Sequence, residues 1–177
     1  IDLGGGMGIN YGKNKEKLNY KQYSNQILKF VKKNNTKIIF EPGRSIIANC
    51  GYLISKIIYI KEGSKKEFVI LDAAMNDFMR PALYNAKHRI IALNKNNKKT
   101  KKIYEFVGPI CESTDKFLTI KKFQKLKEKD LIAICDVGAY GMSLSSNYNL
   151  RPKAAELLIK KSKIQIINKR QNIKDLI

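Results

Sequence analysis

The pattern of apolar and polar residues along the chain changes near Gly51. Before that point, an apolar stripe at helical spacing predicts a helix over Tyr20–Asn34. The apolar run Ile38–Phe40 predicts a fully buried strand, and Ile1–Leu3 reads as the end of another. A strand–helix–strand order is typical of α/β barrels and open parallel sheets, which build their sites at the carboxyl ends of the strands.

After Gly51, short β-rich runs alternate with turn and charged segments. Strands are predicted over Tyr52–Lys61, Glu67–Leu71, His88–Leu93, Lys102–Val107, Asp130–Asp136 and Lys163–Asn168. Their spacing predicts an antiparallel barrel or sandwich, with helical pieces around Met79–Ala86 and Met142–Tyr148. The expected fold class is α/β plus all-β, with residues 1–50 as the α/β part and residues 51–177 as a β-domain.

Two turns follow the first two strands and carry the most informative chemistry. Gly4-Gly5-Gly6 offers backbone N–H groups that can wrap a phosphate, and Glu41-Pro42-Gly43-Arg44 adds an acid and a guanidinium. Taken singly, the first is equally well explained as a tight turn and the second as a surface Glu–Arg pair. Together they favour a site for a phosphate and a cationic ring nitrogen, which indicates pyridoxal phosphate.

Three further stretches could contribute to a site. Arg80 and Tyr84 share a face of a short helix and suit carboxylate recognition, although a surface Arg on a capped helix is the alternative. Cys111 stands beside Glu112 on a turn, where a thiol can be exposed and transfer protons. Tyr140, flanked by glycines, can either approach a ligand or pack on the sheet, and the sequence leaves both open.

Composition and charge exclude several function classes. The net charge is +20, but 30 of the 35 basic residues are scattered lysines, which favours a solvated surface over a specific nucleic-acid site. Three cysteines without metal-type spacing fit a reducing cytoplasm, and no metal site is predicted. No apolar run approaches the ~20 residues of a membrane span, so a soluble protein without a membrane partner is expected. The sole histidine, His88, is interpreted as structural.

Taken together, these motifs resemble the diaminopimelate decarboxylase family of fold-type III pyridoxal-phosphate enzymes. The runs that carry the resemblance are IDLGGGMGINY, EPGRSIIANCG, LDAAMNDFMRPALY, VGPICESTDKF and CDVGAYGMSLSSNYNLRPKAAE. The resemblance implies the C-terminal part of a pyridoxal-phosphate-binding (β/α)8 barrel over residues 1–50, followed by a β-domain with substrate-binding and dimer-interface residues over 51–177. It also implies decarboxylation of meso-2,6-diaminopimelate to L-lysine.

The resemblance further implies a role for each matched residue. Cofactor-binding positions would be Gly5, Gly6, Glu41, Pro42, Gly43, Arg44 and Tyr140. Substrate-binding positions would be Arg44, Arg80, Tyr84, Glu112 and Tyr140. Glu41 would pair with the pyridine nitrogen, and Cys111 would protonate the carbanionic intermediate. In this family Cys111 and Glu112 come from the partner subunit, which implies a homodimer with shared active sites.

One departure from the family pattern matters. The Schiff-base lysine belongs to the N-terminal half of such enzymes, and no match for that half is found from Ile1 onward. We therefore expect a C-terminal fragment that does not decarboxylate by itself. Two alternatives stay open: another fold-type III decarboxylase, acting on ornithine, arginine or carboxynorspermidine, and a non-catalytic homologue. The MNDFMRPALY and CES runs disfavour the first, and intact Glu41, Arg44, Cys111 and Tyr140 disfavour the second.

Overall fold

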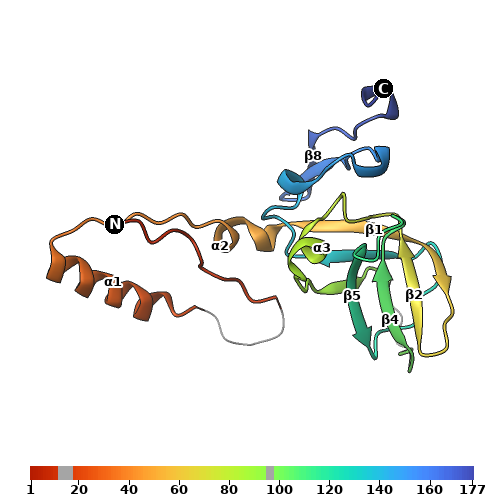
Figure 1. Cartoon of the computed structure of the whole chain (residues 1–177), viewed down its shortest axis with the longest axis horizontal. Coiled ribbons are helices and arrows are strands. Elements are labelled where there is room, and N and C mark those ends of the chain that lie inside the picture. Colours follow the sequence, from red (N-terminus) through yellow and green to blue (C-terminus); the bar gives the residue numbers. More distant parts are fainter. Residues whose placement is uncertain (12–17, 95–97) are drawn as a thin grey trace.

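The computed structural model describes residues 1–11, 18–94 and 98–177. A helix at one end of the long axis and a β-sheet at the other are joined by extended segments, and a hairpin projects from the sheet (Figure 1). The helix, α1, spans Tyr20–Asn34 and confirms the prediction from the apolar stripe. Asn19 caps its start by accepting a hydrogen bond from the Gln22 N–H, and Asn35 ends it in the left-handed conformation with φ 43°.

Two extended segments beside α1 form a short parallel pair. The Leu3 N–H donates to the Ile39 carbonyl and the Ile39 N–H to the Ile1 carbonyl, each at 3.0 Å. The order extended segment, helix, extended segment matches the prediction, although the two segments are joined only by an isolated parallel bridge between Asp2 and Ile39. The prediction of a fully buried strand over Ile38–Phe40 is wrong, because Ile39 is 59% exposed. The helix packs Tyr23 against Phe40, with ring centroids 6.2 Å apart, and leaves the rest of this apolar surface uncovered.

The chain then enters the sheet through the short helix α2, Arg44–Ile47, and a 3₁₀ turn, Ala48–Cys50. The sheet has six strands in the order β3-β6-β1-β2-β4-β5. Their bounds are β1 Tyr52–Lys61, β2 Lys66–Leu71, β3 Ile90–Ala92, β4 Ile103–Val107, β5 Lys116–Lys121 and β6 Leu131–Cys135. The sheet curls because the first half of β1 pairs with β6 and its second half with β2.

The architecture corrects the predicted antiparallel barrel or sandwich. Strands β2 and β4 are parallel, while the other neighbours in the sheet are antiparallel, so the sheet is mixed. The segment between β2 and β4 contains the short helix α3, Arg80–Tyr84, and strand β3 in the other half of the sheet. This long crossover is what allows a parallel pair to form. Strand β5 was not predicted from the sequence.

The concave side of the curled sheet encloses the core. Its fully buried members come from four strands and include Ile57, Val69, Phe106, Ile132 and Ile134. The rings of Tyr104, Phe106 and Phe123 pack edge to face, with centroids 5.7 to 6.4 Å apart. This core fixes the strand ends from which the turns with the predicted site residues project.

The C-terminal segment leaves the sheet and forms a separate hairpin (Figure 1). Two 3₁₀ turns, Met142–Leu144 and Tyr148–Leu150, stand where one helical piece was predicted. The hairpin strands are β7 Glu156–Lys160, which was not predicted, and β8 Lys163–Asn168, which was. Every residue of β8 is exposed, and a last 3₁₀ turn spans Ile173–Asp175.

Candidate functional site

The two predicted phosphate-site turns lie next to each other. The Glu41 N–H donates a hydrogen bond to the Gly4 carbonyl at 2.8 Å, which extends the parallel pair into both turns. Gly4 and Gly6 have φ of 64° and 78°, a region that glycine adopts without strain. A Cβ at Gly5 would lie 2.6 Å from the Glu41 carbonyl oxygen, whereas one at Gly6 would have no atom within 4 Å. The turn therefore needs glycine and leaves open space beside Gly6.

Tyr140 reaches the second turn from the β-domain. Its hydroxyl oxygen lies 2.6 Å from the point that a Cβ of Gly43 would occupy, so the phenol fits there because residue 43 is glycine. A hydrogen bond from the Gly138 N–H to the Ala48 carbonyl, at 3.0 Å, fixes the segment before Tyr140 against the segment after Gly43. Tyr140 is 44% exposed beside this turn, so the side chain is partly open to solvent where it meets Gly43.

Arg80, at the start of α3, contacts both Tyr140 and Tyr84, the other predicted substrate-binding residue of this helix. Its guanidinium carbon lies 5.4 Å from the centroid of the Tyr140 ring and 5.5 Å from that of Tyr84. Both distances are typical of cation–π contacts, which hold a guanidinium in place without using its N–H donors. Arg80 forms no ion pair within the described part of the chain, so its N–H groups can donate hydrogen bonds to a carboxylate.

The remaining residues of the second turn differ in exposure. The Glu41 side chain is exposed, while Pro42 and Arg44 are half-buried. Arg44 is the first residue of α2, and among residues 1–11, 18–94 and 98–177 no ion pair engages its guanidinium. An acid and an unpaired guanidinium thus flank a glycine turn, as the sequence predicted.

Cys111 and Glu112 lie on a second, separate turn. Both are exposed, and the turn is built around the buried carboxylate of Asp115. That carboxylate accepts hydrogen bonds from the Ile110 N–H at 2.8 Å and the Met75 N–H at 2.7 Å. Burial raises the pKa of Asp115, and these two bonds oppose the increase. The buried acid therefore has a structural role, while the thiol and the Glu112 carboxylate face outward.

Tyr148 was missed by the sequence analysis and contacts a predicted site residue. Its hydroxyl donates a hydrogen bond to Oε1 of Glu112. This bond, together with the negative charge of Glu112, raises the pKa of the Tyr148 phenol. The two residues are 36 positions apart and lie on different turns. No local pattern signals such a contact, although Tyr148 stands inside one of the runs that carry the family resemblance.

The predicted residues thus form two groups. One contains the glycine turns, Arg44, Arg80, Tyr84 and Tyr140; the other contains Cys111 and Glu112. Within the described residues, no hydrogen bond, ion pair or ring contact joins the first group to the second. The first group offers open amides and guanidinium donors for anions, and the second offers an exposed thiol and a carboxylate for a proton and a cation.

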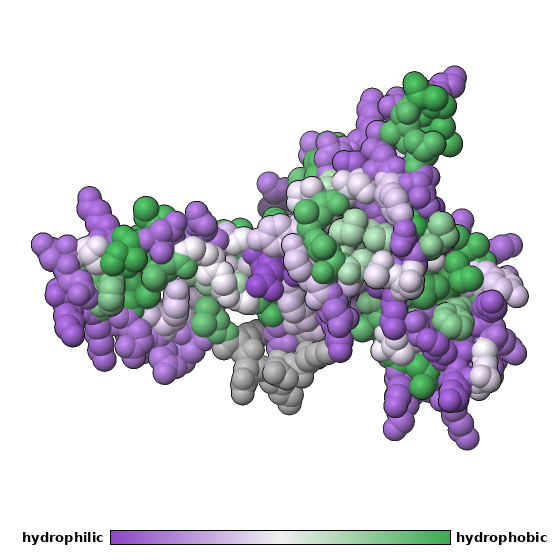
Figure 2. Space-filling model, in the orientation of Figure 1, coloured by the Kyte–Doolittle hydropathy of each residue, from purple (hydrophilic) through white to green (hydrophobic). Residues whose placement is uncertain are grey.

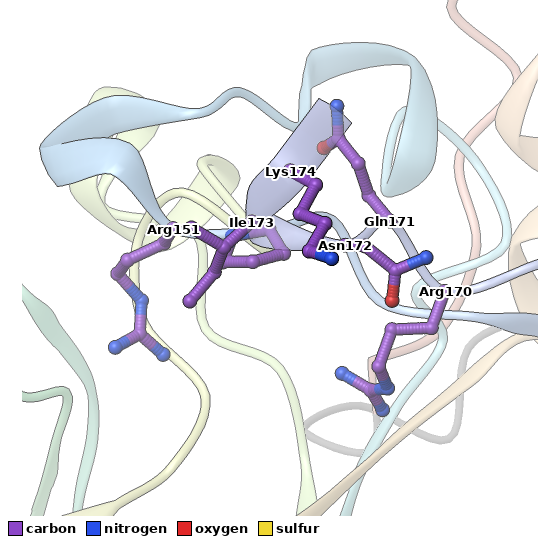
Figure 3. A pocket seen from close by; sticks show the side chains of 7 residues that line it. Arg151, Arg170, Gln171, Asn172, Ile173 and Lys174 are labelled. Atoms are coloured by element: carbon purple, nitrogen blue, oxygen red, sulfur yellow. The ribbon is translucent and has the colours of Figure 1, made fainter. Parts of the chain in front are cut away.

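Outside these two groups of residues, the described chain offers a surface hollow, but no candidate metal site and no helix that could span a membrane. A surface hollow of about 550 Å³ lies where the segment before β7 meets the last turn (Figure 3), and it contains none of the predicted site residues. In the described ranges, no cluster of His, Cys, Asp or Glu side chains has the composition of a metal site. None of the described helices has the length and apolar character needed to cross a membrane.

The chain matches known proteins over nearly its whole length. Residues 17–138 match the family described as pyridoxal-dependent decarboxylase, C-terminal sheet domain. The diaminopimelate decarboxylase of Helicobacter pylori is 45% identical over 176 residues, which cover 99% of this chain and 43% of that protein. The enzyme of the same name from Zymomonas mobilis is 44% identical, over 99% of this chain and 41% of its own length. The chain therefore spans less than half the length of these relatives.

Solved structures give the same result. The crystal structure of H. pylori diaminopimelate decarboxylase complexed with L-lysine has a TM-score of 0.88 and 44% identity, and the match covers 99% of this chain and 43% of that one. For the Methanocaldococcus jannaschii enzyme the TM-score is 0.91 and the identity 39%, over 99% of this chain and 41% of that one. The chain belongs to the pyridoxal-dependent decarboxylase family and carries its C-terminal sheet domain.

Proposed function

We propose that the protein containing this chain is a diaminopimelate decarboxylase, which converts meso-2,6-diaminopimelate to L-lysine with pyridoxal phosphate. The observation that carries the proposal is the hydrogen bond between the glycine turn and the Glu41 turn, at 2.8 Å, in a chain of this family. Relatives named diaminopimelate decarboxylase, two of which have been crystallised with L-lysine, support the choice of substrate. Residues 1–50 would be the C-terminal part of a (β/α)8 barrel, and residues 51–177 the β-domain.

The glycine turns fit the phosphate of the cofactor. Gly5 and Gly6, with Gly43 and Arg44, would hold it through backbone N–H groups and a guanidinium, helped by the open space beside Gly6. Pro42 favours an extended backbone at Glu41, and the Glu41 carboxylate would pair with the pyridine nitrogen of the cofactor. Tyr140 would contact the cofactor from its place against Gly43. When bound, the cofactor supplies an electron sink for the electrons left at the substrate Cα.

Arginines and carboxylates of the chain would bind the two ends of the substrate. Arg80, held between Tyr84 and Tyr140, would bind the distal carboxylate of diaminopimelate together with Arg44. Glu112 would bind the distal ammonium. Cys111 would donate a proton to the substrate Cα after carbon dioxide leaves. Ornithine lacks the distal carboxylate, and its binding would leave the half-buried Arg80 guanidinium without a charged partner, which disfavours it.

The division of the residues into two groups supports a homodimer with shared sites. Cys111 and Glu112 are exposed, and no contact joins them to Arg80 or Tyr140 of the same chain. We propose that they complete the site of a partner subunit, as in the family. The three cysteines are free thiols, which fits the reducing cytoplasm that we propose for the enzyme.

Carbon dioxide release by the full-length protein that contains this chain tests the proposal. We expect release from meso-diaminopimelate, with L-lysine as product, and a rate with ornithine lower by at least about 10³-fold. Cys111→Ala should keep the absorbance of the bound cofactor and lose at least about 10²-fold in kcat. Cys50→Ala is the matched control, because Cys50 is also an exposed free thiol and lies outside the proposed site. Faster turnover of ornithine, or turnover of neither, would contradict the proposal.

The 177-residue chain alone is a separate test. The family pattern gives none of its 30 lysines the role of holding the cofactor covalently. We therefore expect no carbon dioxide from meso-diaminopimelate, even at cofactor concentrations that saturate the full-length protein. Steady release by the isolated chain would show that this expectation is wrong.

A further inference from the structure

We propose that Tyr148 is a positioning residue that sets the orientation of the Glu112 carboxylate toward the distal ammonium of the substrate. The inference rests on the proposed function and deepens it. Its basis is the hydrogen bond that the Tyr148 hydroxyl donates to Oε1 of Glu112. The other oxygen, Oε2, has no hydrogen-bond partner among the residues that the structure describes. One carboxylate oxygen is thus held while the second stays available to a cation.

The turn that carries Tyr148 is anchored to a buried side chain. Asn76 is fully buried; its carbonyl accepts a hydrogen bond from the Ser146 N–H at 2.9 Å, and its Oδ1 accepts one from Nε of Arg151 at 3.0 Å. The turn is thereby fixed on both sides of Tyr148. Asn149 and Leu150 within it have φ of 55° and 53°, which is uncommon for residues with a side chain and persists only where the surroundings impose it.

The turn that carries Glu112 is anchored to the same segment of the chain. Asp115 is buried and accepts hydrogen bonds from Met75 N–H and Ile110 N–H. Met75 immediately precedes Asn76, so one short loop holds both turns. The separation of Tyr148 from Glu112 is therefore set by buried contacts and does not depend on the exposed pair itself. A chance meeting of two surface side chains would not need this double anchoring.

A carboxylate held in this way binds a cation better than a free one. An exposed glutamate has several rotamers, and ordering it on binding costs conformational entropy. Tyr148 would fix the rotamer before the substrate arrives and would leave Oε2 to accept the ammonium. Its effect should therefore fall on KM, since the reacting Cα lies at the other end of the substrate.

The hydrogen bond itself is measured by NMR on the 177-residue chain with ¹³C-labelled tyrosine. We expect the Tyr148 phenol to titrate at a higher pH than the ordinary value for tyrosine, because the Glu112 carboxylate accepts its proton in a hydrogen bond and stabilises its neutral form. In Glu112→Ala the difference should disappear. Titration of Tyr148 that is the same with and without Glu112 would overturn the inference, whatever the protein catalyses.

A double-mutant cycle on the full-length protein that contains this chain tests the positioning role. Tyr148→Phe should raise KM for meso-diaminopimelate about five- to tenfold and change kcat less than about twofold. In the Glu112→Ala background the same substitution should change kcat/KM less than about twofold, since its only target is gone. Tyr59→Phe, which removes the hydroxyl of another exposed tyrosine on β1, is the matched control and should leave both constants unchanged.

The outcomes separate the two proposals. An equal effect of Tyr148→Phe in both backgrounds means that Tyr148 acts without Glu112, and it overturns the positioning role while leaving the proposed function intact. An effect on kcat instead of KM does the same. If the wild-type protein releases no carbon dioxide from meso-diaminopimelate, the proposed function fails and the positioning role fails with it.

Discussion

His88 occupies a buried position where a neutral imidazole fits and an imidazolium does not. Its Nδ1 donates to the Cys135 carbonyl at 3.0 Å, while the buried Nε2 has no hydrogen-bond partner among the residues that the structure describes. The rings of Phe78 and Tyr11 meet it edge-on, with centroids at 4.6 and 4.8 Å. Burial lowers the pKa of His88; the Cys135 carbonyl opposes the shift, and the charge of Arg80 adds to it. Since Tyr11 follows the glycine turn, the histidine also ties that segment to the sheet.

The lowered pKa of His88 predicts a loss of stability in mild acid. The unfolded chain takes up the proton first, near the ordinary value of about 6.5, so the stabilisation is complete above that pH and is lost as the pH falls below it. Urea unfolding of the 177-residue chain should give a free energy of unfolding lower by up to about 1 kcal/mol at pH 5.5 than at pH 7.5.

His88→Phe provides the matched comparison. Phenylalanine keeps the ring contacts with Phe78 and Tyr11 but cannot titrate, and it loses the bond to the Cys135 carbonyl. The variant should be less stable by about 1 kcal/mol at pH 7.5, and the difference from wild type should shrink as the pH falls to 5.5. A constant difference between the two proteins would mean that His88 does not cause the acid sensitivity.

At the scale of secondary-structure elements, the position of the candidate site depends on a close backbone contact, here called the joint, between the segment Ile47–Gly51 at the end of α2 and Gly138 in the turn after β6. Here two backbones touch: a Cβ on Gly138 would lie 2.1 Å from the Ile47 carbonyl oxygen, and one on Gly51 would lie 2.2 Å from the Gly138 N. Neither atom can move aside as a flexible side chain would. The close approach brings Tyr140 to Gly43, so the site depends on it.

Gly138→Ala should therefore destabilise the chain. Overpacking against backbone atoms predicts a free energy of unfolding lower by about 2–3 kcal/mol, measured by urea denaturation at pH 7.5. Gly8→Ala is the control, because a Cβ there meets no atom within 4 Å and its φ is not in the left-handed region. That substitution should leave the free energy of unfolding unchanged or raise it by up to about 1 kcal/mol. An equal change in the free energy of unfolding at the two positions would show that the backbones at the joint can move apart to make room for a Cβ.

The elements that could be predicted from sequence are those with a strong local pattern. The bounds of α1, β1 and β8 match the predictions, because their apolar residues recur at a clear helical or strand period. Strand β7 was missed, since Glu156–Lys160 consists mostly of good helix formers and its strand form depends on pairing with β8.

Pairings across long sequence distances could not be predicted in the same way. The parallel neighbours β2 and β4 are joined by a crossover, and nothing in either strand specifies the partner. The same holds for the site: the two phosphate-type turns could be paired by their chemistry, whereas Tyr148 and Glu112 are brought together by anchoring contacts of Asn76 and Asp115. The family resemblance supplied residue roles that local patterns do not contain.

At the scale of the whole molecule, many large apolar side chains are exposed. Apolar side chains gather on the N-terminal part and on the projecting C-terminal segment (Figure 2). On the hairpin the exposed members are Leu157, Leu158, Ile159, Ile164, Ile166 and Ile167. Leu157 pairs with Ile166 and Ile159 with Ile164, so these four side chains share one face of the hairpin. An exposed apolar face of this kind drives association in water. The net charge of +20 opposes it through repulsion, and added salt screens that repulsion.

We therefore predict that the 177-residue chain self-associates through the hairpin, and more strongly in salt. Sedimentation should give a mass above 20.3 kDa that increases between 50 and 500 mM NaCl, because screening weakens repulsion and leaves apolar burial intact. Ile159 and Ile164 face each other across the hairpin and are 70% and 68% exposed, so either offers a large apolar area to a partner.

The variant Ile159→Lys, compared with Gln165→Lys, distinguishes the contribution of apolar burial to self-association from that of charge. It removes an exposed apolar side chain and adds one positive charge, whereas Gln165→Lys adds the same charge to the same hairpin without removing apolar area. Association should weaken at least about tenfold in Ile159→Lys, since burying an isoleucine contributes about 1.5–3 kcal/mol, and should change little in Gln165→Lys. Equal weakening in both variants would mean that charge alone governs association. No weakening in either would place the contact on the N-terminal apolar surface instead.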